Sequence, residues 1–155
     1  MKAIVSKLIV NKLDTAWFPF RQEDNINKLV WQKVIVNCVF NSVCPLLEVD
    51  NGVFYREPSA MGIANRIIDE CIVIARRSAI VLKQDEIRET LLSISRASDG
   101  QFISTLQDIR NHRPTEINTL NLEVAAIARS FGLDAEVTIT RTLGELITLK
   151  SQINR

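Results

Sequence analysis

The stretch "WQKVIVNCVFNSVCP", residues 31–45, is apolar almost throughout, yet Lys33, Asn37 and Asn41 recur in it at every fourth position. On an α-helix a step of four residues advances about 400°, so each of the three is rotated only about 40° from the last. They form one narrow polar stripe on an apolar helix, the inverse of the usual surface helix. The stretch therefore predicts a mostly buried helix whose cation and two amides need partners.

Length and composition indicate one ordinary globular domain. The chain has 155 residues, of which 46% are hydrophobic and 24% charged, with a formal net charge of +1. This charge is too small to hold a nucleic acid or an anionic membrane. Polar residues interrupt the apolar runs before the roughly 18 to 20 residues that span a bilayer. The N-terminal "MKAIVSKLIVNKLD" is too polar for a signal peptide, so we expect a cytoplasmic protein without nucleic-acid or membrane partners.

Cysteines and glycines give no sign of a metal or nucleotide site. Cys38, Cys44 and Cys71 are odd in number, lie in apolar surroundings and lack CxxC spacing, so they predict buried structural thiols. The five glycines are too far apart for a GxGxxG turn or a Walker loop. We therefore expect no metal ligands and no cofactor-binding residues in this chain.

Helical periodicity and capping signals divide the chain into helices. Cys44 and Pro45 should end the striped helix, Ser59 and Asp85 should cap two later helices, and Pro114 should open another. Only "AWFPF" (16–20) and "GVFYR" (52–56) could be extended. The fold is predicted to be all-α, a single helical domain of about six or seven helices. The predicted helices cover residues 3–13, 25–43, 59–80, 85–95, 102–110, 114–128 and 136–151.

The polar stripe has two readings. It could be a solvated seam between packed helices, which spacing alone favours. Three polar residues in register weaken that reading, because each buried amide or ammonium without a partner costs on the order of 1 to 3 kcal/mol. A ligand rich in oxygen would satisfy a lysine and two amides equally well.

A second polar cluster lies in "GQFISTLQDIRNHRPTEINTLN", residues 100–121. Ser104 begins a predicted short helix, and Glu116 lies in the first turn of the helix opened by Pro114, where a carboxylate is favourable whether or not it has a function. Asp108 is expected to pair with Arg110 or Arg113. The single histidine, His112, is expected to be solvated rather than catalytic, so a nucleophilic triad is improbable.

Four segments together resemble the C-terminal helical domain of the ketopantoate reductase (2-dehydropantoate 2-reductase) family. They are "NINKLVWQKVIVNCVFNSVCPLL", "EC", "SISRASDGQFISTLQDIRNHRPTEINTLN" and "AIARSFGL", in order between about residues 15 and 133. The most specific signal pairs a W-x-K-x-x-x-N-x-x-x-N helix with a later S-T-x-Q-D-x-x-x-x-R-x-T-E-I segment. The resemblance implies a fold like the C-terminal domain of 6-phosphogluconate-dehydrogenase-like reductases.

The resemblance also implies roles for five residues. In this family an N-terminal Rossmann domain holds NADPH, and a 2-oxo acid, ketopantoate, binds between the two domains and is reduced to pantoate for pantothenate biosynthesis. Lys33 matches the proton donor to the ketone oxygen, and Glu116 an acid that contacts the substrate and tunes the lysine. Asn37, Asn41 and Ser104 match substrate-binding residues. A homodimer through helical faces is a further possibility.

The chain departs from the family pattern in three places. The Rossmann domain is absent, so we expect residues 1–14 to be a connector helix, residues 15–155 the substrate-binding domain, and the chain alone to be inactive. Asn118 stands where the family has aspartate, and Leu122 where it has glycine, which leaves the helix packing and the exact substrate open. The chain could be a domain of a longer enzyme or a partial gene product. The alternatives are a related 2-oxoacid reductase of unknown substrate, or a non-catalytic helical association module.

Overall fold

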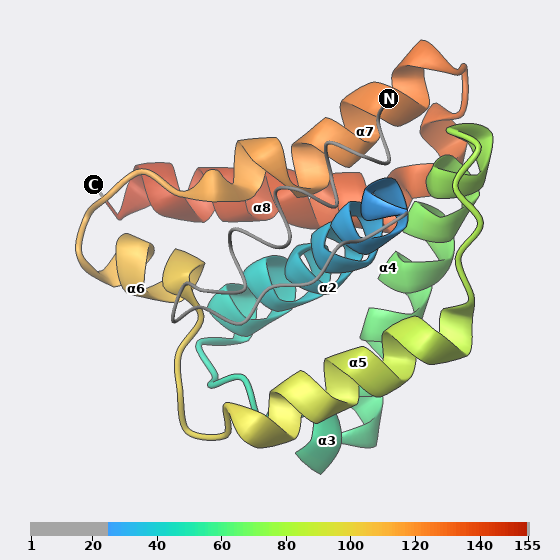
Figure 1. Cartoon of the computed structure of the whole chain (residues 1–155). Helices are drawn as coiled ribbons and strands as arrows, with labels where there is room; N and C mark the ends of the chain where they lie inside the picture. The colour runs from blue at the N-terminus through green and yellow to red at the C-terminus, as the bar shows by residue number, and fades with distance from the viewer. Residues whose placement is uncertain (1–24, 155) are drawn as a thin grey trace, which may run out of the picture.

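The computed structural model describes residues 25–154, which contain seven α-helices, two 3-10 helices and no strand (Figure 1). The all-α prediction is therefore confirmed. The predicted helix 3–13, the connector 1–14 and "AWFPF" lie outside the described residues. The elements are α2 (Ile26–Leu47), α3 (Val53–Arg56), α4 (Pro58–Arg77), α5 (Gln84–Ala97), α6 (Ser104–Arg110), η1 (Glu116–Thr119), α7 (Asn121–Ser130), η2 (Asp134–Val137) and α8 (Thr138–Ile153).

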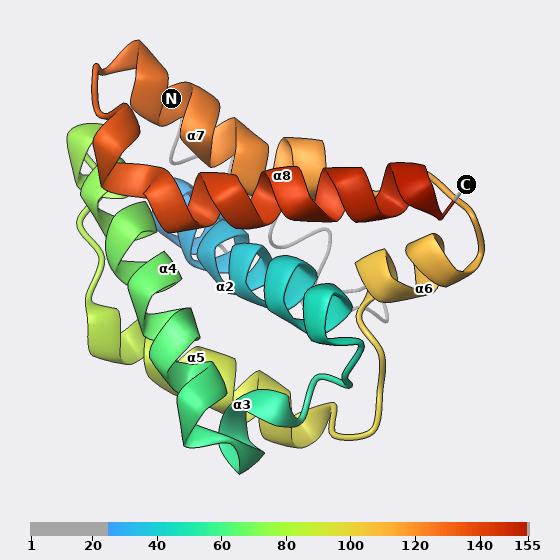
Figure 2. The ribbon, with the colours of Figure 1, turned by 180° about the vertical axis from the view of Figure 1, so that it is seen from behind.

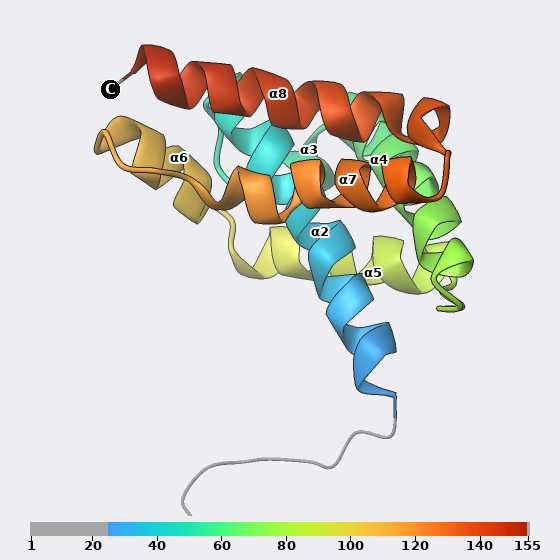
Figure 3. The same ribbon diagram turned by 90° about the horizontal axis from the view of Figure 1, so that it is seen from above.

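Helix α2 is the central element of the fold. It packs against α4, α5, α6 and α8. Figure 1 shows α2 between α7 and α8 above and α5 below, and Figure 3 shows it crossing α5. Every residue from Cys38 to Pro45 is buried, whereas the first two turns from Ile26 are exposed or half-buried. The stretch that opened the sequence analysis thus forms the core, and its N-terminal half reaches the surface.

By length and composition α2 is the one helix among residues 25–154 that could cross a membrane, although we expected its polar residues to prevent this. In its most apolar 18-residue window, 56% of the residues are buried inside the fold. The helices packed around α2 therefore supply its apolar surroundings, as they do for a core helix in a water-soluble fold.

The predicted ends of α2 and of the next segment were partly wrong. Pro45 lies inside the last turn of α2, and the helix continues to Leu47. The "GVFYR" segment is not extended but forms the short helix α3. Its first turn is held by Asp50, whose carboxylate accepts a 2.7 Å hydrogen bond from the Gly52 N–H and an ion pair of 2.9 Å from Arg56. The Asp50 side chain before the segment and the Arg56 side chain at its end therefore stabilise a helical turn that local propensity does not predict.

Three helices also begin at other residues than predicted. Helix α4 begins at Pro58, with Glu57 rather than Ser59 at the N-cap position, and α5 begins at Gln84, so that Asp85 lies in its first turn. Pro114 does not open an α-helix: the chain forms η1 and then starts α7 at Asn121. The backbone of Leu120 (φ −116°, ψ −101°) separates the two and prevents one continuous helix.

The three thiols are buried, as predicted. Burial, with Asp50 close by, raises the pKa of Cys44 to about 12. The hydrogen bond of the Cys38 thiol to Cys71, together with burial, raises the pKa of Cys38. A protonated, buried thiol behaves as a small apolar side chain, so these cysteines serve packing.

Glu70 in α4 caps the beginning of α8, in the region where the two helices meet in Figure 2. Its Oε1 accepts a 2.9 Å hydrogen bond from the Ile139 N–H, and its Oε2 accepts one of 2.7 Å from the Thr140 N–H. The first N–H groups of a helix have no partner within the helix, and a carboxylate there also meets the positive end of the helix dipole. Glu70 thereby joins α4 to α8 across the core.

Leu122, the residue that replaces the family's glycine, lies against a glycine of α8. A Cβ added to Gly144 would lie 2.8 Å from Leu122 Cδ2 and 2.9 Å from Asn121 Cβ, closer than such atoms normally approach. Helices α7 and α8 run side by side at this point (Figure 2). The absence of a side chain at Gly144 therefore makes the room that Leu122 occupies, and the departure at Leu122 leaves the helix pair closely packed.

We expect Glu70→Ala to lower the free energy of unfolding by about 1 to 3 kcal/mol, because two buried helix N–H groups lose a charged acceptor. Urea denaturation of the variant and of Glu89→Ala, an exposed glutamate on α5, measures this. Equal effects of the two substitutions would contradict the assigned cap.

We expect Gly144→Ala to destabilise the protein by about 1 to 3 kcal/mol through overpacking, despite the better helix propensity of alanine. The loss of stability caused by Gly144→Ala should be smaller when Leu122→Ala is also present. Part of the loss should remain, because Asn121 Cβ is still close to position 144. A double-mutant cycle by denaturation measures the coupling, and additive effects would show that Leu122 and Gly144 do not share this space.

Candidate functional site

Two of the three stripe residues line a groove between α2 and α5. Lys33 and Asn37 contribute from α2 and Thr90 from α5, and the groove has a volume of about 330 Å³. The other lining residues are Gln32 and the aliphatic side chains Leu29, Val36 and Ile94. A primary ammonium and an amide are thus presented on one side of an otherwise largely aliphatic depression.

Lys33 and Asn37 both have side chains without partners among residues 25–154. Lys33 is exposed and Asn37 half-buried, and neither side chain makes a hydrogen bond or ion pair within this part of the chain. The backbone carbonyl of Asn37, by contrast, accepts from Asn41. Three ammonium donors and a complete amide are therefore available to a ligand in the groove.

Asn41, the third stripe residue, is only 4% exposed and has its hydrogen bonds within the protein. Its Oδ1 accepts a 2.7 Å bond from the buried Thr105 hydroxyl, and its Nδ2 donates to the Asn37 carbonyl at 3.0 Å. The stripe thus changes along its length, from exposed Lys33 through half-buried Asn37 to buried Asn41. In this structure Asn41 joins α2 to α6.

Ser104 and Glu116 begin α6 and η1, two elements that pack against α2. Both residues are exposed, and neither lines the groove that contains Lys33 and Asn37. The neighbour of Ser104, Thr105, is the residue bonded to Asn41, which fixes the start of α6 against the stripe. The five predicted site residues therefore lie on or beside α2, and the structure brings two of them into one groove.

An ion pair joins the same two helices beside the groove. Lys28 of α2 and Lys83 each lie 3.1 Å from the carboxylate of Glu86 on α5. Hydrogen bonds from Lys83 and then Lys28 lower the pKa of Glu86. Because Glu86 is paired, the positive charge of Lys33 is not neutralised by it.

The other charged residues of the second polar cluster, and its histidine, already have partners within the protein. Asp108 pairs with Arg113 at 3.0 Å, one of the two partners predicted, and the guanidinium of Arg110 lies 4.3 Å above the Phe102 ring. His112 is exposed, as predicted, and its Nδ1 contacts the Asn154 carbonyl. These residues shape the loop between α6 and η1.

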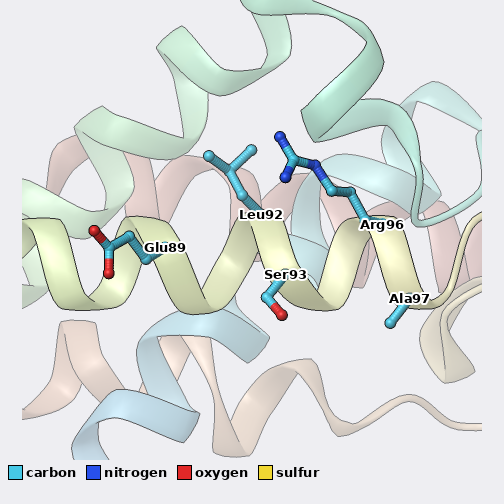
Figure 4. A pocket seen from close by; sticks show the side chains of 5 residues that line it. All are labelled: Glu89, Leu92, Ser93, Arg96 and Ala97. Atoms are coloured by element: carbon cyan, nitrogen blue, oxygen red, sulfur yellow. The ribbon is translucent and has the colours of Figure 1, made fainter.

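Other depressions lie elsewhere on the described surface. Figure 4 shows one along α5, where the side chains of Glu89, Leu92, Ser93, Arg96 and Ala97 all project from the single helix. A second, of about 180 Å³, lies on the opposite side of α2 and is almost wholly apolar, with Trp31 and Val34 among its lining. Within residues 25–154 no three His, Cys, Asp or Glu side chains gather as a metal site would require.

Sequence reasoning missed Thr90, Ile94 and Thr105. Periodicity places Ile94 on the same face of α5 as Ile87 and Leu91, so the pattern assigned it to the core and contained no sign that it would line a groove beside α2. For Thr105 a sign existed, since a hydroxyl next to Ser104 in an otherwise apolar turn needs a buried partner.

Comparison with known proteins identifies the family. Residues 25–151 match the family model described as ketopantoate reductase PanE/ApbA C terminal. The 2-dehydropantoate 2-reductase of Streptococcus pyogenes serotype M3 (strain ATCC BAA-595 / MGAS315) is 26% identical over 132 residues, which are 84% of this chain and 42% of that protein. The Escherichia coli O157:H7 enzyme is 28% identical over 120 residues, 77% of this chain and 37% of that protein. The chain thus spans about two fifths of the length of the curated relatives it matches.

Solved structures share the fold. A ternary structure of D-mandelate dehydrogenase with NADH and anilino(oxo)acetate superposes with a TM-score of 0.87 at 24% identity, covering 97% of this chain and 62% of that one. A PanE/ApbA family ketopantoate reductase from Ralstonia eutropha JMP134 gives a TM-score of 0.80 at 24% identity, covering 90% and 46%. With a family model that matches most of its length, the chain belongs to the ketopantoate reductase family and corresponds to its C-terminal helical domain.

Proposed function

We propose that this chain is the substrate-binding and catalytic half of an NADPH-dependent 2-dehydropantoate 2-reductase, which reduces ketopantoate to pantoate. The observation that carries the proposal is the pair Lys33 and Asn37, both without partners in the described part of the chain and lining one groove. Asn37 is half-buried, where a donor without a partner is costly for stability, and a ligand would remove that cost, whereas the exposed ammonium of Lys33 is free to turn toward the ligand.

Lys33 is the proton donor in this proposal. Reduction of a 2-oxo acid adds a hydride to the carbonyl carbon, and negative charge develops on the oxygen. An ammonium beside that oxygen stabilises the charge and then transfers a proton, which yields the hydroxyl group and leaves a neutral amine. Solvent can reprotonate the amine, because Lys33 is exposed.

The remaining residues bind and orient the substrate. Asn37 donates to and accepts from the hydroxyl end of the substrate, while Ser104 and Glu116 approach it from the first turns of α6 and η1. Glu116 has no ion pair within residues 25–154, and the family resemblance gives its carboxylate the role of tuning Lys33. Asn41 contributes by fixing α6 against α2 rather than by direct contact.

The reduced nicotinamide, which supplies the hydride, requires a second domain in this proposal. The described residues form helices only, and the sequence contains no glycine-rich phosphate-binding turn. The curated relatives are more than twice as long as the matched region, which leaves room for a Rossmann domain, and this chain alone should be inactive. A cytoplasmic location fits three unpaired thiols.

A homodimer through helical faces remains part of the proposal. One structural neighbour is described as a dimeric ketopantoate reductase from Staphylococcus aureus. On this chain, α8 presents the exposed apolar side chains of Leu146, Leu149 and Ile153, which a second subunit could cover.

We expect Lys33→Ala to lower kcat by about 10² to 10⁴ when this chain is joined to its nucleotide-binding domain, since a general acid is lost. NADPH affinity should stay unchanged. Lys83→Ala, which removes a 77% exposed lysine, is the matched control. The loss of reduced-nicotinamide absorbance with ketopantoate measures the rate, and near-normal turnover of Lys33→Ala would refute the assigned role. Turnover by the 155-residue chain alone would contradict the need for a second domain.

Asn37→Ala and Asn41→Ala should separate ligand binding from stability. Asn37→Ala should raise KM with little change in the free energy of unfolding, because that amide has no partner to lose. Asn41→Ala should cost about 1 to 3 kcal/mol in stability, because the buried Thr105 hydroxyl loses its acceptor. Denaturation measures the free energy of unfolding of both variants, and steady-state kinetics measures their KM. Equal free energies of unfolding would contradict the assignment of Asn37 to the ligand and of Asn41 to the fold.

A further inference from the structure

A second polar cavity lies between η1 and the C-terminal half of α8, where the segment that follows α6 passes beside α8 (Figure 2). Its volume is about 210 Å³, far more than the roughly 10 to 15 Å³ that a single water needs. None of its lining residues lines the groove that contains Lys33 and Asn37. Its polar lining consists of Thr115 and Asn118 beside α8 and of Thr148, Ser151 and Gln152 on α8.

Ser151 is the most buried polar residue of this cavity, and its hydroxyl has no partner. Only 4% of the residue is exposed, and its Oγ makes no hydrogen bond within residues 25–154. A hydroxyl inside a helix can donate back to a carbonyl one turn earlier, as Thr148 of the same helix does to the Gly144 carbonyl at 2.9 Å. A buried hydroxyl without such a bond costs stability. Rotation about the Cα–Cβ bond of Ser151 can direct its hydroxyl to a ligand in the cavity.

The other polar side chains of the cavity are also available to a ligand. The amides of Asn118 and Gln152 and the hydroxyl of Thr115 make no hydrogen bond within the described part of the chain. The Thr148 hydroxyl donates to Gly144, but its oxygen can still accept. Each amide both donates and accepts, as the hydroxyl groups of a ligand do, so the lining matches a molecule that carries several hydroxyl groups.

The charges around the cavity argue against an ionised ligand. The cations that adjoin it in sequence are engaged: Arg113 pairs with Asp108 at 3.0 Å. Lys150 pairs with Glu48 at 2.6 Å. An anion would lose hydration in the cavity without meeting a free cation, and the nearby carboxylate of Glu116 would disfavour it further. The lining itself contains no carboxylate that would pair with a cation.

From these observations we infer that the cavity between η1 and α8 is a binding site for a small uncharged polyol, with Ser151 as its most buried contact. Pro114 and Ile117 offer an apolar surface to the carbon chain of the ligand, and its hydroxyl groups meet the amides and hydroxyls of the lining. The inference does not rest on the proposed function, because Lys33 and Asn37 take no part in this site.

The test is an NMR titration of the 155-residue chain with glycerol, erythritol and glycerol 3-phosphate. Backbone amide shifts at Asn118, Ser151 and Gln152 report the cavity, and those at Asn37 report the groove. We expect saturable shifts at the cavity alone with both polyols, and tighter binding of erythritol, which has one more hydroxyl group. Glycerol 3-phosphate should bind more weakly than glycerol. A melting temperature would not distinguish binding, because polyols stabilise folded proteins by exclusion from their surface.

Substitutions in the lining test the contacts. Ser151→Ala and Gln152→Ala should each weaken erythritol binding by about two- to tenfold, the effect of one lost hydrogen bond. Ser93→Ala and Gln101→Ala, at exposed positions outside the cavity, are the matched controls and should leave the affinity unchanged. Without ligand, Ser151→Ala should not lower the free energy of unfolding in urea, because the hydroxyl that it removes has no partner to lose.

The outcomes decide the inference without touching the role of Lys33. Saturable shifts at the cavity that Ser151→Ala and Gln152→Ala both weaken support the site. It is overturned by shifts that rise linearly over the whole surface, by no shift at the cavity, or by an affinity that neither substitution changes. Tighter binding of glycerol 3-phosphate than of glycerol, or a loss of stability in ligand-free Ser151→Ala, would overturn it too. Lys33→Ala should leave erythritol binding unchanged.

Discussion

The burial of α2 is the constraint on which the rest of the structure depends. From Cys38 to Pro45 the helix is enclosed on all sides, so each polar group in this half must find a partner inside the protein. Ser42 donates to the Cys38 carbonyl at 2.6 Å, and Asn41 is satisfied by Thr105 and the Asn37 carbonyl. Only the half of α2 before Cys38 can offer polar groups to a ligand. Lys33 and Asn37 of the stripe lie in that half, whereas Asn41 lies in the buried half.

The same burial explains how the surrounding helices are held. Helix α6 is tied to α2 through Thr105, α5 through the Lys28–Glu86 ion pair, and α8 is joined to the core through its cap at Glu70. The half-buried ion pair contributes little to stability on its own, whereas the buried hydroxyl and the cap replace hydrogen bonds that water can no longer make. A few polar contacts thus set how α5, α6 and α8 are placed in the fold, and the burial of apolar side chains supplies most of the stability.

The sequence predicted the existence and order of the longer helices because their apolar faces repeat at helical spacing. It failed where single side-chain contacts or an irregular backbone decide the local structure. Asp50 bonds the Gly52 N–H and pairs with Arg56, which turns "GVFYR" into α3, and the backbone at Leu120 breaks the helix expected after Pro114. Pro45 lies in the last turn of α2, where its missing N–H removes one i→i−4 hydrogen bond but only two helical residues follow, and its ring is buried.

The sequence likewise predicted only part of the candidate site. Spacing placed Lys33, Asn37 and Asn41 on one face, and the family resemblance added Ser104 and Glu116. Spacing could not distinguish an amide facing a groove from an amide bonded to Thr105, because both lie on the same stripe and differ only in what packs over them. The aliphatic wall from α5 depends on how two helices cross, which periodicity within either helix does not determine.

The contact between Leu122 and Gly144 couples two positions on neighbouring helices. A leucine at position 122 leaves no room for a side chain opposite it on α8, so any larger residue at 144 would overpack the contact. The identity of residue 144 is therefore set less by the helix that contains it, where alanine would be the better helix former, than by one leucine on the neighbouring helix.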